Sequence, residues 1–392
     1  MTQSNDHREH LTQSITSHFS RHARTGSISS STNLVPLADQ KWLVALSARS
    51  ALDLYLQVKK YPRNTYVLMS AVNIPDLSIV LKHHGLIPYP IDLDIPHLSP
   101  RVDHLQELLE TLTPRVSCVL VAHIFGRRFE TDAIAKLTIK YKVDLIEDAA
   151  EAFRGFDFVG HPAASLAFFS FGSIKATTGF GGGVARVRDQ AVFEKMNQLQ
   201  QSYPLQDRSI YAKKIIAGFA AGNILESGMV MRMCRRWEVD PKPHVVSMLR
   251  GFSGDLVPRL RTQPSTPLLY MLARRFERFD LKDYMIGIEK AELFCKLLPR
   301  NVFIPGRDLP DAFRHHWLFP MVVDHPDKAE VLLNEHGVLC YRGATQLNLV
   351  EPPTQQQLRQ EHQPLSDTLP TPVLSTPQNP RHNSFYLVTC IR

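Results

Sequence analysis

The chain has 392 residues, a formal net charge of +7 and a hydrophobic content of 44%. This length predicts one large domain with a smaller one, and the composition is typical of a globular protein with a buried core. Together they exclude a wholly disordered chain, a collagen-like fibre and a disulfide-stapled mini-protein. The five cysteines form no Cys-x-x-Cys pair, so we expect no zinc site and a reduced, intracellular setting.

The sequence contains no run of about 18 uncharged apolar residues, the length that a membrane-spanning helix needs. Its first residues lack the apolar core of a secretory signal peptide. We therefore expect no membrane span and a cytoplasmic protein. The small basic excess suits anionic small substrates as well as nucleic acids, and it does not distinguish between them.

In chain order, residues 1–33 come first, and their many Ser and Thr with few large apolar residues predict a disordered tail. From Val35 to Val187, short apolar runs alternate with amphipathic segments, which predicts a mainly parallel sheet covered by helices on both faces. The expected strands are Tyr66–Met69, Ile87–Ile91, Ser117–Ala122, Val143–Ile146, Leu166–Phe171 and Gly183–Val187. The expected helices are Ser50–Tyr61, Asp76–His84, Val102–Leu112 and Glu130–Tyr141.

The second half of the chain predicts more helix and a small α/β domain. Residues 188–300 look largely helical, and residues 200–280 are expected to form a helical insertion in a large domain over residues 34–290. A smaller C-terminal domain is expected over residues 291–350. Its expected elements are a strand at Trp317–Val323, a helix at Lys328–His336 and a strand at Val338–Tyr341. Residues 351–392 begin with a Pro- and Gln-rich stretch, which predicts a loose tail.

The first segment that suits chemistry is Leu46–Leu52. Ser47, Arg49 and Ser50 open an amphipathic helix, and the free N–H groups and positive dipole end of a helix can hold a phosphate. Taken alone, this signal is weak, because a serine that only caps the helix explains these residues.

The second segment is the apolar strand Val143–Ile146 with the acids that follow it, Glu147, Asp148 and Glu151. Ligands of open α/β sheets bind at the carboxyl ends of the strands, so Asp148 lies where a functional carboxylate is expected. A helix-capping aspartate is the plainer alternative.

The third segment is the apolar strand Leu166–Phe171, which runs into Lys175. A lysine at the rim of a buried sheet is partly desolvated, which lowers its pKa and makes it a candidate amine nucleophile. A lysine that only extends its charge to solvent is the alternative. The glycines at 179 and 181–183 do not fit a dinucleotide fingerprint, because Val184 stands at the last glycine position and a strand follows.

Together these segments predict pyridoxal phosphate as the cofactor. It needs a lysine for a Schiff base, a carboxylate for its pyridine nitrogen and a cradle for its phosphate. Lys175, Asp148 and the helix start at Arg49 supply one of each.

The same segments resemble the DegT/DnrJ/StrS family of sugar aminotransferases, which have fold type I. The order and spacing agree from about Val35 to Val187, and the stretch His316–Gln346 matches more weakly. Four motifs carry the resemblance: Ala48–Leu52 to the phosphate segment, His123–Gly126 to H-x-x-G, Ile146–Glu151 to EDAAQ, and Ser170–Lys175 to SFxxxK with its glycine-rich turn.

The resemblance implies a fold type I α/β protein whose large domain, with a mainly parallel sheet, binds the cofactor beside a smaller C-terminal α/β domain. It also implies a role for each matching residue. Lys175 is expected to form the Schiff base, Asp148 to pair with the pyridine nitrogen, Arg49, Ser50 and Ser170 to lie near the phosphate, and Glu151 to lie near the ring hydroxyl.

Three departures from the family pattern are visible. Glu151 replaces the family's Gln, and a carboxylate repels the ring oxygen unless it is protonated or turned away. Asn73 and Ile74 stand where the family often stacks an aromatic side chain on the ring. The G-Y-N-x-R-M segment of the family's dimer interface is not recognisable.

The three tryptophans are expected in the core or at interfaces: Trp42, Trp237 and Trp317.

The resemblance implies a transaminase that moves an amino group, from glutamate, to a keto group of a nucleotide-linked sugar. It further implies a cytoplasmic homodimer of polysaccharide biosynthesis, and we expect no metal and no nucleic-acid partner. Two alternatives stay open. One is another class of pyridoxal phosphate enzyme, such as a sugar dehydratase, although those relatives carry His in place of the lysine. The other is a catalytically silent relative with a binding or regulatory role, which Glu151 and the missing dimer motif favour.

Overall fold

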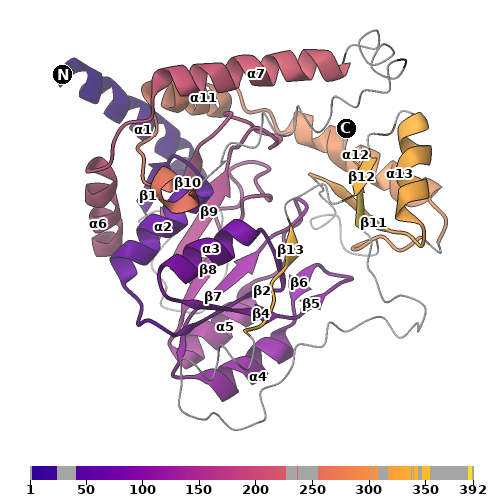
Figure 1. Cartoon of the computed structure of the whole chain (residues 1–392), viewed down its shortest axis with the longest axis horizontal. Helices are drawn as coiled ribbons and strands as arrows, with labels where there is room; N and C mark the ends of the chain where they lie inside the picture. The colour runs from indigo at the N-terminus through magenta and orange to yellow at the C-terminus, as the bar shows by residue number, and fades with distance from the viewer. Residues whose placement is uncertain are drawn as a thin grey trace.

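A computed structural model of the chain describes residues 2–23, 41–226, 236, 255–300, 302–307, 317–336, 338, 340–342, 347–353 and 387–390. Its main body is a seven-stranded sheet in the order β1-β10-β9-β8-β7-β2-β4, with helices on both faces (Figure 1). The five strands from β9 to β4 are parallel, and β10 runs antiparallel to both of its neighbours. The strands are β1 Lys41–Ala45, β2 Tyr66–Ser70, β4 Ile87–Ile91, β7 Val116–Ala122, β8 Asp144–Asp148, β9 Leu166–Ser170 and β10 Gly183–Val187.

Alternation along the strands sends side chains into two separate cores. In β2, Val67 and Met69 pack into the core under helices α2 and α3, while Tyr66 and Leu68 pack into the core under α4 and α5. Nearly continuous apolar strands are what a sheet covered on both faces requires. The covering helices are α2 Ala48–Lys59, α3 Pro75–His83, α4 Val102–Leu112, α5 Asp132–Tyr141 and α6 Gln190–Gln201.

The N-terminal segment is a helix, α1, over Thr2–Ala23. Leu11, Ile15 and Phe19 recur at four-residue spacing and are all buried, against β1 and helix α11 (Thr266–Glu277). The expectation of a disordered tail over residues 1–33 is therefore wrong for these residues, because the polar composition hides one apolar stripe that a long-range contact covers. Residues 24–33 lie outside the described part of the chain.

Helices dominate after β10, as the sequence predicts. Besides α6 and α11 they are α7 Arg208–Glu226, α10 Leu256–Leu260 and α12 Lys282–Leu297. Helix α7 lies beside α11 at the edge of the body, as Figure 1 shows. No helix in the described ranges is both long and apolar enough to cross a membrane.

A second, smaller sheet of three strands lies beside helix α13 (Pro326–Glu335). Its order is β11-β14-β12, with β11 Phe319–Val322, β12 Cys340–Arg342 and β14 Leu387–Cys390. The expectation of a loose tail over residues 351–392 is wrong for Leu387–Cys390, because this segment forms the central strand. Residues 354–386 lie outside the described part.

Four short strands form two further antiparallel pairs. Strand β13 (Asn348–Leu349) pairs with β3 (Val72–Asn73) of the large body, and β5 (Leu93–Asp94) pairs with β6 (Ser99–Pro100). The C-terminal part of the chain is thus tied back to the first half, next to the end of β2.

Candidate active site

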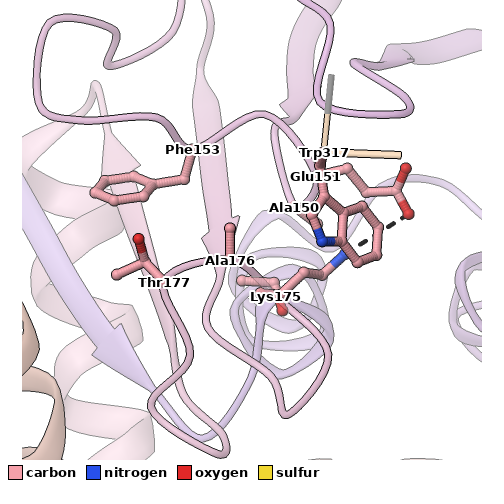
Figure 2. Close-up of a pocket in the computed structure, with 8 residues that line it drawn as sticks. Ala150, Glu151, Phe153, Lys175, Ala176, Thr177 and Trp317 are labelled. Carbon is pink, nitrogen blue, oxygen red and sulfur yellow. Dashed lines mark ion pairs between the residues drawn. The ribbon is translucent and has the colours of Figure 1, made fainter. Parts of the chain in front are cut away.

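The site lies where β7, β8 and β9 end side by side. Ala122 of β7 is opposite Asp148 of β8, and Asp148 is opposite Phe168 of β9. The carboxyl ends of parallel strands form the usual ligand crevice of an open α/β sheet. The loops that leave β8 and β9 carry Glu151 and Lys175 into this crevice (Figure 2).

Asp148 ends β8 and is 7% exposed. Within the described residues its carboxylate accepts one hydrogen bond, from the Ala150 N–H to Oδ1 at 3.0 Å. Burial raises the pKa of Asp148 to about 7, and the nearby Glu151 charge adds to the rise. The charge of Lys175 opposes this rise without cancelling it, so the carboxylate would gain from a further cationic group beside it.

Lys175 follows β9 in a turn closed by its own N–H, which donates to the Gly172 carbonyl at 3.0 Å. Its Nζ lies 3.6 Å from Glu151 Oε1 and 4.0 Å from the ring centroid of Trp317 (Figure 2). Burial lowers the pKa of Lys175, and the charges of Glu151 and Asp148 oppose that effect. A lysine with a lowered pKa supplies more of the neutral amine that acts as a nucleophile.

Trp317 is a site residue that the sequence did not reveal, since the tryptophans were expected in the core or at interfaces. Its backbone N–H donates to the Phe125 carbonyl at 2.8 Å, and the next residue, Leu318, is buried in a cluster around Phe125. Phe125 itself has a left-handed φ of 59°. No local pattern predicts this contact, because it joins segments far apart in the chain.

The start of helix α2 forms a second part of the site. Ser47 caps the helix by accepting the Ser50 N–H, and the two hydroxyls are 3.0 Å apart. Arg49 forms an ion pair with Asp76 of α3, and its charge also acts on Lys175. A Cβ at Gly183 would collide with the backbone of Ser47 and Ala48, so β10 closely abuts this helix start.

His123 and Glu147 form a buried polar cluster beside the site. The His123 ring packs against Phe129 with centroids 4.2 Å apart and the ring planes tilted by 32°, and its Nε2 is 3.5 Å from Glu147 Oε1. Thr131 donates a further hydrogen bond to Glu147 at 2.9 Å. No cluster of metal-binding side chains occurs among the residues that the structure covers.

The structure brings most of the predicted site residues together. Glu151, Ser170 and Lys175 line one cavity, and the charges of Asp148 and Arg49 reach the Lys175 amine. The Ser50 hydroxyl instead contacts Ser47 and is not part of the cavity lining.

The cavity itself is nearly filled. It measures about 10 Å³, which is room for about one water molecule. Its lining comprises Ala150, Glu151, Phe153, Ser170, Lys175, Ala176, Thr177 and Trp317. A cofactor ring can therefore enter only when the Lys175 or Trp317 side chain moves.

Comparison with known proteins agrees with this architecture. The structure superposes on an aminotransferase, TlmJ from Streptoalloteichus hindustanus, with a TM-score of 0.58 and 16% identity over 97% of this chain and 84% of that one. It also superposes on a DegT DnrJ EryC1 StrS aminotransferase from Brucella abortus with a TM-score of 0.57 and 13% identity over 98% and 91% of the two chains. The fold is fold type I, the fold of these aminotransferases.

Sequence similarity is more specific than the fold. Residues 36–233, half of the chain, match the DegT/DnrJ/EryC1/StrS aminotransferase family, and the chain belongs to that family. A dTDP-4-amino-4,6-dideoxy-D-glucose transaminase from Shigella dysenteriae is 32% identical over 58% of this chain and 60% of its own length. A UDP-4-amino-4-deoxy-L-arabinose–oxoglutarate aminotransferase from Shewanella sediminis is 30% identical over 30% of this chain and 29% of its own length. The matches thus span about 60% or less of these relatives.

The donor set fits pyridoxal phosphate. The buried Asp148 carboxylate, with one hydrogen bond and a raised pKa, suits a protonated ring nitrogen. The buried Lys175 amine has the lowered pKa that an imine-forming lysine needs. The capped start of α2 beside Arg49 offers helix N–H groups for a phosphate.

Proposed function

We propose that this chain is a pyridoxal phosphate-dependent transaminase that moves an amino group from glutamate to a keto group of a nucleotide-linked sugar. The observation that carries the proposal is the pair of a buried acid, Asp148 at the end of β8, and a buried amine, Lys175 in the turn that follows the adjacent parallel strand β9. Family membership supports the cofactor. The names of the two relatives, a dTDP-sugar transaminase and an oxoglutarate aminotransferase, support the substrates.

Each site residue then has a distinct task. When bound, the cofactor supplies an electron-withdrawing ring that stabilises negative charge on the substrate carbon. Asp148 would keep the ring nitrogen protonated, and Lys175 would hold the cofactor and later move a proton at the substrate carbon. Arg49, Ser50 and Ser170 would bind the phosphate.

The visible absorption of the purified chain with added pyridoxal phosphate tests this proposal. We expect the yellow band of a pyridoxal Schiff base, its loss in Lys175→Ala, and no change in Lys136→Ala, which removes an exposed lysine of α5. Glutamate should bleach the band as the amino group moves to the cofactor. A band that persists with glutamate would contradict glutamate as the donor.

A catalytically silent relative is the second candidate, and one observation favours it. Glu151 and Trp317 both contact the Lys175 amine, and the cavity around them holds about one water. A wild-type chain that stays colourless with added cofactor would support this candidate over the enzyme.

We further propose the family setting for this chain: a cytoplasmic homodimer of polysaccharide biosynthesis, with a nucleotide sugar and an amino acid as substrates. Sedimentation equilibrium of the full chain tests the dimer directly. A monomer at all concentrations would contradict it.

A further inference from the structure

Lys175 has two neighbours that both stabilise a positive charge. The Glu151 carboxylate lies 3.6 Å from its Nζ, and the face of the Trp317 indole lies 4.0 Å away. A carboxylate favours the ammonium form by direct attraction, and an aromatic face does so through its quadrupole. Both contacts favour the ammonium form, which cannot attack a carbonyl, and so they oppose the lowering of the Lys175 pKa by burial.

A single residue, Phe125, anchors both neighbours. Its N–H donates to Glu151 Oε2 at 2.8 Å, and its carbonyl accepts the Trp317 N–H at 2.8 Å. Glu151 therefore uses one oxygen to fix itself and turns the other to Lys175. The backbone of the loop after β7 therefore fixes the positions of both Glu151 and Trp317.

Other charges also face the amine. Asp148 of β8 favours the ammonium form, whereas Arg49 of α2 disfavours it. Three ionisable groups in the described part of the chain lie one contact further away. Asp76 of α3 and Lys214 of α7 interact with Arg49, and the Tyr284 hydroxyl of α12 contacts the Thr177 hydroxyl. Among these groups, Glu151 is the one that forms an ion pair with Lys175.

We propose that Glu151 is a positioning residue that holds the Lys175 side chain in an ion pair, with the amine beside the Trp317 ring. Glu151 thereby sets the pH range in which the amine reacts with an aldehyde. The proposal deepens the proposed function and rests on it for the identity of the aldehyde, which is the cofactor. The resemblance places Gln at this position, and a neutral amide cannot form the ion pair. This chain would therefore capture its cofactor at a higher pH than a chain with Gln would.

The chemistry of the test is a simple condensation. The neutral amine forms a bond to the aldehyde carbon, and the carbonyl oxygen leaves as water. Cyanoborohydride then delivers hydride to that carbon, which gives a stable alkylated lysine. Formaldehyde is a suitable probe because it is small and does not depend on cofactor binding.

The experiment measures the rate of Lys175 methylation by formaldehyde and cyanoborohydride across pH 6–10 in the full, cofactor-free chain, using peptide mass spectrometry. Removing an opposite charge lowers the pKa of the amine, so Glu151→Gln should react about 3- to 10-fold faster at pH 7 and reach its plateau at lower pH. Trp317→Phe should shift the profile less and in the same direction. Glu110→Gln, an exposed carboxylate of α4, should match the wild type.

Two results would overturn the proposal. One is a pH profile of Glu151→Gln that coincides with that of the wild type. The other is a Lys175 that does not react in either protein, because burial rather than Glu151 would then control its reactivity. Thermal unfolding checks that each variant is folded, and Trp317→Phe gives an independent reading. A parallel reaction with pyridoxal phosphate separates the claims. If formaldehyde shows the shift but the cofactor never modifies Lys175, the proposed function fails while the role of Glu151 stands.

Discussion

Asp148 and Glu147 are adjacent acids with opposite environments. Burial alone would raise the pKa of Glu147, but hydrogen bonds from the His123 ring and the His161 N–H, with the charge of Arg186, bring it below its usual value. Asp148 points to the other face of the sheet, where burial raises its pKa to about 7. Glu147 is thus a satisfied structural acid, while the charge of Lys175 offsets the burial of Asp148 only in part, so that Asp148 can still gain from a further cationic partner.

Asp148→Asn should stabilise the cofactor-free chain at alkaline pH. The folded state keeps a proton on Asp148 between about pH 4 and 7 that the unfolded state loses, so stability falls as the pH rises through this window. At pH 8 the whole penalty is present, and the variant should be more stable by about 2–4 kcal/mol. Urea unfolding at pH 5 and pH 8 measures the difference.

The same variant should bind pyridoxal phosphate more weakly, because its amide carries no charge for the ring nitrogen. Glu107→Gln, which changes an exposed carboxylate of α4, is the control. Its free energy of unfolding should differ from that of the wild type by the same small amount at pH 5 and pH 8. If Asp148→Asn differs from the wild type in stability by the same amount at pH 5 and pH 8, the pKa of Asp148 is not raised in the folded chain and the prediction is contradicted.

At the scale of elements, the contact between β10 and the start of α2 shapes the phosphate end of the site. The run of glycines predicts a tight turn into a return strand, and Gly183 does begin β10. Its φ is not left-handed, so the glycine is needed for close approach to the backbone of Ser47 and Ala48. Any side chain here pushes the helix start away.

Gly183→Ala should therefore destabilise the chain by about 1–3 kcal/mol through overpacking and should also weaken cofactor binding. Gly287→Ala in α12 is the matched control, because no atom lies within 4 Å of its added Cβ. That control should be neutral or stabilising by about 0.5–1 kcal/mol, since alanine favours a helix. Thermal unfolding and cofactor titration of both variants measure these effects. Equal losses in Gly183→Ala and Gly287→Ala would contradict the close contact between β10 and the start of α2.

Helix α1 contributes stability through Phe19, which is fully buried. The ring lies 4.6 Å from Trp42 and 5.0 Å from Phe156, measured between ring centroids. Phe19→Ala should cost about 3–5 kcal/mol in the free energy of unfolding. His10→Ala, on the exposed side of the same helix, should cost little, and equal losses in the two variants would mean that α1 does not pack as described.

For the whole molecule, the sequence predicts the central sheet well. The strand at Ile87–Ile91 and the helix at Val102–Leu112 match the structure in their bounds, because continuous or periodic apolar residues define them locally. The sequence does not predict the edge strand β1, and it predicts loose tails where the structure has the helix Thr2–Ala23 and the strand Leu387–Cys390. Each of these is stabilised by partners distant in sequence.

In the candidate site too, features defined locally could be predicted from the sequence, and features that depend on distant partners could not. Asp148 and Lys175 follow recognisable strands, so their convergence could be predicted from the parallel order of β8 and β9. Trp317 could not be predicted, since its approach depends on hydrogen bonds between the C-terminal part and Phe125. The ion pair of Glu151 with Lys175 likewise depends on how two loops meet.

The central claim is that Lys175 and Asp148 together capture pyridoxal phosphate. The most direct measurement is to incubate the full chain with the cofactor, reduce it with borohydride and locate the modified lysine by peptide mass spectrometry. The account predicts a pyridoxyl group on Lys175, with much less in Asp148→Asn. Modification of other lysines alone, or of none, would contradict it.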